Sequence, residues 1–148
     1  MFHVVLYQPE IPPNTGNIIR LCANTGSGLH LIHPLGFEFD DRRLRRAGLD
    51  YREWVGVRQY RDWSEFLERA PGERLFACST RGRKDYAAAE YQPGDMLVFG
   101  PETRGLPENL LRQLPPERRV RIPMRPENRS LNLSNAVAVI LYEAWRQQ

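Results

Sequence analysis

The chain has 148 residues, of which 41% are hydrophobic and 26% are charged, and its formal net charge is +3. This length is typical of one domain with a sizeable core. No apolar run reaches the roughly 18 residues that span a bilayer, and the first residues lack the basic region of a signal peptide. We therefore expect a cytoplasmic protein, in which the two cysteines, Cys22 and Cys78, are reduced and packed.

The positive charge is carried by arginine, since Lys84 is the only lysine. Arginine binds phosphate through two parallel hydrogen bonds and stacks on bases better than lysine does. The arginines gather in two regions, which suits a polyanion such as RNA, although a solvated face or a codon preference would give the same composition. These regions contain Arg42, Arg43, Arg45 and Arg46 in one cluster and Arg118, Arg119, Arg121, Arg125 and Arg129 in the other.

The first half of the chain predicts strands that alternate with helices. Residues 2–7 form an apolar strand, Asn14 can cap a helix that runs to about Thr25, and Gly26 occupies the position of a left-handed C-terminal cap. The following elements are a strand at 29–33, a basic helix from Asp40 or Asp41 to about 47, a weaker strand at 54–60, and a helix at 62–69 that Asp62 caps.

The second half continues this alternation, which predicts an α/β fold with a largely parallel sheet. Strands are expected at 74–78, 95–99 and 118–122, and Pro107 opens a short helix. Residues 79–94 predict either a mobile loop or a short helix around 86–90. The last helix, at 136–145, is apolar on most sides and is therefore expected to be buried.

Several kinds of chemistry are not supported. There is no phosphate-binding P-loop and no G-x-S-x-G nucleophile motif. Gly26 and Gly28 begin a dinucleotide fingerprint, but they precede a strand instead of following one. His3, His30 and His33 lack metal-ligand spacing with cysteine or acidic partners, so we interpret them as packed or surface residues and expect no metal.

Three polar loops follow three predicted strands, at residues 78–80, 100–107 and 123–134. Ligands of open α/β sheets bind outside the carboxyl ends of the strands. Gly100 and Gly105 would let the backbone approach a ligand, and Glu102 lies between them, either as a functional carboxylate or as a surface acid in a turn. The first helix adds Asn14, Asn17 and Arg20, which also fit a capping asparagine and a solvated arginine. The residues alone predict an α/β ligand-binding domain with a nucleic-acid partner.

Three segments in this order resemble the motifs of the SPOUT class of RNA methyltransferases. They are Asn-Thr-Gly-Asn-Ile-Ile-Arg at 14–20, Phe-Gly-Pro-Glu-Thr-Arg-Gly-Leu at 99–106, and Ile-Pro-Met at 122–124 with Ser-Leu-Asn-Leu-Ser-Asn-Ala at 130–136. The resemblance covers nearly the whole chain. It is greatest to small single-domain members that act on the tRNA wobble position, and residues 6–17 and 45–51 are especially similar.

The resemblance implies one SPOUT domain over residues 1–148, with a C-terminal trefoil knot in about residues 75–148. It implies transfer of a methyl group from S-adenosylmethionine to the ribose 2′-hydroxyl of nucleotide 34, a cytidine or uridine, in the anticodon stem-loop of tRNA. S-adenosylhomocysteine would be the product, and no metal is involved. It also implies a homodimer, for which Tyr142, Trp145 and the first helix could supply an apolar contact.

By position, the resemblance assigns roles to individual residues. Arg20 would face the reacting hydroxyl, Asn14 and Glu102 would orient it or the nucleotide, and Ser130 and Asn132 would hold the third loop. The cofactor pocket would contain Cys78, Gly100, Gly105, Ile122, Met124 and Ser130. The tRNA would contact Arg42, Arg43, Arg45, Arg46 and Arg125.

Two alternatives remain open. Members of this class share their catalytic loops, so the same residues would serve a methyltransferase for another tRNA position or for ribosomal RNA. A non-catalytic RNA-binding factor in ribosome assembly is the other alternative. Against it stand the intact polar residues of the motifs, namely Asn14, Arg20, Glu102, Ser130 and Asn132.

Overall fold

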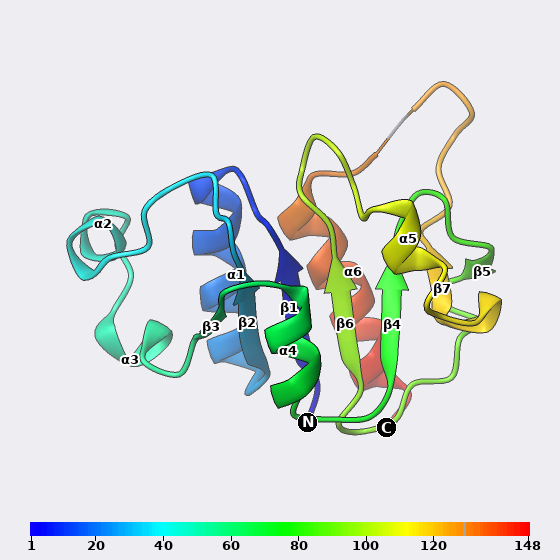
Figure 1. Ribbon diagram of the computed structural model, residues 1–148, viewed down its shortest axis with the longest axis horizontal. Coiled ribbons are helices and arrows are strands. Elements are labelled where there is room, and N and C mark those ends of the chain that lie inside the picture. The colour runs from blue at the N-terminus through cyan, green and yellow to red at the C-terminus, as the bar shows by residue number, and fades with distance from the viewer. Residues whose placement is uncertain (129) are drawn as a thin grey trace.

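The computed structural model describes residues 1–128 and 130–148 (Figure 1). Within these residues, seven strands form one sheet in the order β3-β2-β1-β6-β4-β7-β5, and each pair of neighbours is parallel. The predicted α/β fold with a parallel sheet is therefore confirmed. The strands are β1 (His3–Tyr7), β2 (Gly28–Ile32), β3 (Arg58–Tyr60), β4 (Leu75–Cys78), β5 (Lys84–Asp85), β6 (Met96–Phe99) and β7 (Arg119–Arg121).

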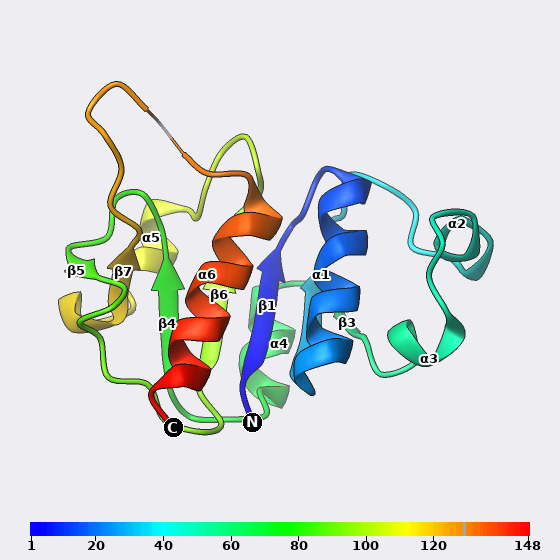
Figure 2. The same cartoon turned by 180° about the vertical axis from the view of Figure 1, so that it is seen from behind.

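Helices cover both faces of the sheet (Figures 1 and 2). The long helices α1 (Pro12–Thr25) and α6 (Leu133–Arg146) lie side by side on one face, and α4 (Trp63–Arg69) and α5 (Glu108–Leu111) lie on the other. Because the central strands are covered on both faces, their sequences are almost continuously apolar. Three short helices complete the described chain: α2 (Asp41–Arg46), α3 (Tyr51–Trp54) and the 3₁₀ helix η1 (Pro116–Arg118).

The start of α1 differs from the prediction. The helix begins at Pro12, and its N-cap residue, Ile11, makes no side-chain capping bond. Proline is suited to the first helical positions because it needs no hydrogen-bond partner for a backbone N–H. Asn14 therefore lies inside the helix, where it is buried and bonds to other loops. Gly26 ends the helix in the left-handed conformation, with φ of 69°, as predicted.

The third predicted strand was too long. Only Arg58–Tyr60 is extended, because Asp50 and Glu53 form a capping box that starts α3 at Tyr51. The spacing of an N-cap acid and a glutamate three residues later is the local signal for this helix start. The short helix around 86–90 is absent from the described chain, where β5 and a series of turns occupy this segment.

Helix α6 is less buried than its composition suggests. One face, with Val137, Ile140, Leu141 and Ala144, packs into the core. The exposed fractions of Val139, Tyr142 and Trp145 are 37%, 50% and 49%, and the last two rings stack with centroids 5.8 Å apart. The expectation that this helix is buried on most sides is therefore wrong for a single chain. An exposed apolar face of this kind is typical of an interaction surface.

The segment that follows β4 crosses from one side of β7 to the other. Ser79 N–H donates to the Val120 carbonyl at 2.9 Å, and Arg83 N–H donates to the Arg119 carbonyl at 3.0 Å. β4 pairs with one side of β7 and β5 with the other. A Cβ atom on Gly82 would lie 2.5 Å from the Val120 carbonyl oxygen, so the crossing needs a glycine.

Both cysteines are free and buried, as expected. Burial raises the pKa of Cys22 to about 12 and raises the pKa of Cys78 well above its usual value. Neither thiol is therefore ionised near neutral pH. No helix among the described residues is both long enough and apolar enough to cross a membrane.

A row of polar side chains, half-buried at His3 and buried at His30 and Tyr60, connects the first three strands. His3 Nδ1 lies 3.0 Å from His30 Nε2, and His30 Nδ1 lies 2.8 Å from the hydroxyl of Tyr60. His30 is only 2% exposed, and burial together with the nearby His3 and Arg58 lowers its pKa to about 4. This confirms the interpretation of His30 as a packed residue, which the folded protein holds in its neutral form.

The pKa of His30 predicts a loss of stability in acid. Below its unfolded value of about 6.5, the unfolded chain binds a proton that the folded chain accepts only near pH 4. The free energy of unfolding should therefore fall between pH 7 and pH 4, by about 2 kcal/mol at pH 5 from this group. Urea unfolding at several pH values measures it. His30→Gln should flatten this pH dependence, and His33→Gln, at the half-buried histidine bonded to Gln59, should not.

Candidate functional site

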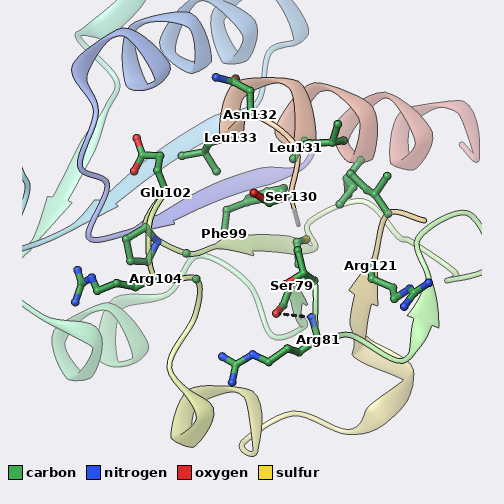
Figure 3. A pocket seen from close by; sticks show the side chains of 18 of the residues that line it. Ser79, Arg81, Phe99, Glu102, Arg104, Arg121, Ser130, Leu131, Asn132 and Leu133 are labelled. Atoms are coloured by element: carbon green, nitrogen blue, oxygen red, sulfur yellow. Dashed lines mark hydrogen bonds between the residues drawn. The ribbon is translucent and has the colours of Figure 1, made fainter. Parts of the chain in front are cut away.

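A cavity of about 510 Å³ lies where the carboxyl ends of β4, β6 and β7 meet. The three predicted polar loops line it together with the start of α1 and one side of α6 (Figure 3). The loops come from distant parts of the chain and surround one hollow. All six residues predicted for a cofactor pocket are among the lining residues: Cys78, Gly100, Gly105, Ile122, Met124 and Ser130.

The Glu102 carboxylate joins the second loop to the turn between β1 and α1. Its two oxygens accept the backbone N–H groups of Glu10 and Ile11, each at 2.8 Å. The second oxygen also accepts the Asn14 side-chain amide at 3.2 Å. Both N–H groups directly precede α1, and a carboxylate beside the positive end of a helix dipole stabilises the start of the helix.

The chain of hydrogen bonds continues from α1 to α6. Asn132 donates its side-chain amide to Asn14 Oδ1 at 3.0 Å. The Asn132 side-chain oxygen caps α6 by accepting the N–H of Ser134 at 3.0 Å and the N–H of Asn135 at 3.3 Å. Glu102, Asn14 and Asn132 all line the cavity. The bonds among them hold three segments of the chain together at one place.

A second glutamate, Glu10 in the turn between β1 and α1, accepts hydrogen bonds from the second loop. Glu10 Oε1 accepts both the backbone N–H of Thr103 at 2.9 Å and its hydroxyl at 2.7 Å. The pKa of Glu10 is lowered, mainly by the backbone hydrogen bond from Thr103. Glu10 and Glu102 therefore clamp the two loops reciprocally. Glu10 was not among the predicted site residues, although an acid just past the end of a predicted strand is a signal for such a contact.

The glycines of the second loop have a structural reason of their own. A Cβ atom on Gly100 would collide with the backbone of Gly105 and Leu106, because the loop closes tightly on itself. Gly105 adopts a positive φ of 68°, which side chains disfavour. From the sequence, these glycines were predicted to let the backbone approach a ligand. The structure adds that the loop itself needs them to turn.

Arg81, which the sequence analysis did not select, fastens the first loop to the second. Its guanidinium donates to the Leu106 carbonyl and to Glu108 Oε2, the latter at 2.8 Å. Its backbone N–H donates to Ser79 Oγ at 3.1 Å (Figure 3). An arginine three residues after a strand is a weak sequence signal, because only the fold brings its partners close.

Arg20 lies outside the cavity lining of its own chain. Its Nε donates to Glu53 Oε2 at 3.0 Å, and its Nη2 donates to the Gly48 carbonyl at 2.7 Å. The side chain is 52% exposed. The structure therefore brings together four of the five predicted catalytic residues, and it places Arg20 separately, on the side of α1 that faces α3.

The arginines of the basic cluster on α2 differ in the contacts that they make. Arg43 is paired with Glu38 and with Asp40, which raise its pKa. The Arg45 guanidinium lies 5.9 Å from the centre of the Trp54 ring. In the described part of the chain, Arg42 and Arg46 are exposed and form no salt bridge, and Arg125 is exposed on the loop before α6. Of the second cluster, Arg129 lies outside the described residues.

Glu102 should contribute to stability through its hydrogen bonds. Glu102→Gln replaces one acceptor oxygen with an NH₂ group that would face a donor from the turn or from Asn14. We expect the free energy of unfolding to fall by about 1–3 kcal/mol, as measured by urea denaturation. Glu68→Gln, at an exposed position of α4 on the opposite face of the sheet, is the control and should change it little. Equal effects of the two variants would contradict the assigned contacts.

Comparison with known proteins adds independent findings. The SpoU rRNA Methylase family matches residues 1–142. A tRNA (cytidine(34)-2′-O)-methyltransferase of Escherichia coli (strain K12) is 61% identical over 147 residues, which cover 99% of this chain and 94% of the relative.

Two solved structures are similar to this chain. One, described as giving structural insights into the 2-OH methylation of C/U34 on tRNA, has a TM-score of 0.91 and 51% identity, covering 99% of this chain and 95% of that one. The SpoU methyltransferase AviRb from Streptomyces viridochromogenes, in complex with AdoMet, has a TM-score of 0.80 and 28% identity, covering 98% of this chain and 57% of that one. The fold, the converging motif loops and these similarities together establish that the chain belongs to the SpoU methylase family.

Proposed function

We propose that this chain transfers the methyl group of S-adenosylmethionine to the ribose 2′-hydroxyl of nucleotide 34, a cytidine or uridine, of tRNA. The observation that carries the proposal is the convergence of three motif loops on one cavity, joined through Glu102, Asn14 and Asn132. The names and nearly complete coverage of the relatives support the substrate. The product is S-adenosylhomocysteine, and the reaction needs no metal.

The cavity suits a molecule of the size and character of S-adenosylmethionine. Its volume of about 510 Å³ lies in the usual range for small-molecule sites. Cys78, Gly100 and Ile122 offer little side-chain polarity, so backbone groups would do most of the binding, with Gly105, Met124 and Ser130 completing the pocket. When bound, this cofactor supplies the electrophilic methyl group. The AdoMet complex of a member of the same family supports the assignment.

The position of Arg20 supports a site shared between two copies of the chain. Arg20 lies outside the cavity of its own chain, and the adjacent helix α6 exposes Val139, Tyr142 and Trp145. A homodimer that covers this apolar face would bring α1 of one protomer near the partner. We therefore assign Arg20 to the cavity of the other protomer. The pairing is symmetric, so each copy both gives and receives a guanidinium.

In this arrangement the protein aligns the reacting groups and stabilises charge. The Arg20 guanidinium is a cation, so it would stabilise the negative charge that develops on the 2′-oxygen as the hydroxyl proton passes to water. Asn14 and Glu102 fix the start of α1, and Ser130 and Asn132 hold the third loop. Holding the ribose oxygen in line with the methyl carbon supplies much of the rate enhancement of such a transfer.

The tRNA would be held by arginines on the surface of the dimer. Arg42, Arg46 and Arg125 are exposed, and Arg45 is fixed beside Trp54, where it extends the same basic surface. Arg43 contributes less, because Glu38 and Asp40 neutralise its charge. An anticodon stem-loop offers both phosphates for these side chains and unstacked bases that a protein can read.

The chain forms one domain over residues 1–148, with a trefoil knot in about residues 75–148. The crossing of residues 79–83 over β7 supports the knot. It places β7 between β4 and β5, the two strands that this segment connects. The knot would carry α6 to the cavity that Asn132 borders. Modification of tRNA by the relatives supports a cytoplasmic location.

Removal of Arg20 tests the reaction. Arg20→Ala should lower the methylation rate by roughly 100-fold or more, because a preorganised charge at the transition state is lost. Binding of S-adenosylmethionine, measured by calorimetry, should be unchanged. Mapping of 2′-O-methyl groups in tRNA and ribosomal RNA identifies the target. A wild-type rate for the variant, or a product only in ribosomal RNA, would contradict the proposal.

The same variant tests whether the site is shared. A heterodimer of one Arg20→Ala subunit and one Asn132→Ala subunit contains one cavity with all its groups if Arg20 acts across the interface. Purified through two different tags, it should regain about half of the wild-type rate, by symmetry. If Arg20 serves its own chain, both cavities lack a group and the heterodimer stays as slow as either parent.

The basic surface should control the salt dependence of tRNA binding. Replacing Arg42 and Arg46 together with glutamine should reduce the slope of log K against log salt by about 2, since each phosphate contact contributes roughly one unit. Filter binding at several salt concentrations measures the slope. Arg43→Gln is the matched control on the same helix and should change it much less. Binding of S-adenosylmethionine should be retained in both.

A further inference from the structure

Helix α2 ends in a tightly defined cap. Gly48 adopts a positive φ of 86°, its N–H donates to the Arg45 carbonyl at 3.0 Å, and the N–H of Leu49 donates to the Leu44 carbonyl at 3.1 Å. These two bonds form a Schellman motif, which requires a residue that tolerates the left-handed region. Leu44 and Leu49 are both buried, as the apolar contact of this motif demands. The cap determines where the Gly48 carbonyl points.

A second cap follows without an intervening loop. Asp50 accepts the N–H of Arg52 at 3.1 Å, and Glu53 Oε1 accepts the N–H of Asp50 at 2.7 Å, so α3 starts with a capping box. The capping box uses only one oxygen of the Glu53 carboxylate. The other oxygen is held in a defined place by the start of the helix and is available for a second partner.

Arg20 bonds to both caps at once. Its Nη2 donates to the Gly48 carbonyl at 2.7 Å, and its Nε donates to the second oxygen of Glu53 at 3.0 Å. The pKa of Glu53 is lowered, first by the hydrogen bond from Asp50 and then by Arg20. These contacts leave the Nη1 group of Arg20 free of both caps. The end of the segment 45–51, together with Glu53, thus forms a support for one guanidinium.

We propose that Glu53, together with the Gly48 carbonyl, positions Arg20 for the methyl transfer; the inference rests on the proposed role of Arg20. An exposed ion pair adds little to stability, so the fold gains little by bonding an arginine that is 52% exposed. A long, flexible side chain must, however, be held in one rotamer if it is to meet a transition state. Glu53 acts through Arg20 and does not touch the substrate.

Glu53→Gln separates the two tasks of the carboxylate. The single amide oxygen can serve the cap at Asp50, and the NH₂ group then faces the Nε–H of Arg20. We expect a roughly tenfold lower single-turnover methylation rate with saturating tRNA and cofactor. The dissociation constant of S-adenosylmethionine should stay within about twofold, because Glu53 does not line the cavity.

Asp50→Ala is the matched control. It removes the other half of the same capping box and leaves the contact between Arg20 and Glu53 intact. A purely structural role predicts equal loss of rate in the two variants and would overturn the inference. The positioning role predicts loss in Glu53→Gln alone. The double variant Arg20→Ala with Glu53→Gln should then be no slower than Arg20→Ala.

Two readouts distinguish the possible failures. If Arg20→Ala itself keeps the wild-type rate, the proposed function of Arg20 fails. If Arg20→Ala is slow but Glu53→Gln is not, the positioning inference alone fails. Solvent exchange of the Arg20 Nε–H, followed by nitrogen-15 NMR, should accelerate in Glu53→Gln and stay slow in Asp50→Ala. Unchanged exchange in Glu53→Gln would also overturn the inference.

Discussion

The carboxylate of Glu102 is the contact on which the site depends. It fastens the start of α1 to the loop after β6, and Asn14 passes this connection on to Asn132 at the cap of α6. The partners are 88 and 118 residues apart in the chain. Closing chain loops of this length costs conformational entropy, so these contacts depend on the rest of the fold to bring the segments together. The geometry of the cavity therefore depends on the packing of the whole sheet.

The polar residues of the motifs divide into two groups by their contacts. Glu102, Asn14 and Asn132 bond chiefly to one another and to helix ends, so their side chains hold the loops in place. Arg20 is held by a separate pair of caps on the far side of α1. The proposed site would thus combine a cavity held by these bonds with one charged group that has its own support. Precise alignment on rigid elements is what a direct transfer between two bound molecules requires.

Local signals predicted much of the fold. Apolar runs located the strands, Asp40, Asp62 and Gly26 marked helix ends, and the convergence of loops follows from a parallel sheet. The sequence-based predictions failed where a contact with a distant residue outweighs the local preference of a side chain. Asn14 has the chemistry of a cap, but Glu102 and Asn132 engage its side chain within the helix. The periodicity of α1 predicts the face that carries Arg20, but not which residues meet it.

The exposed face of α6 has a further consequence for how such an enzyme behaves. If each active site needs side chains from two copies of the chain, a single copy contains no complete active site. The fraction of chains in working sites then depends on protein concentration by mass action. Specific activity would decline on dilution although every chain stays folded. Tyr142 and Trp145, which lie outside the cavity lining, would set the concentration at which this decline begins.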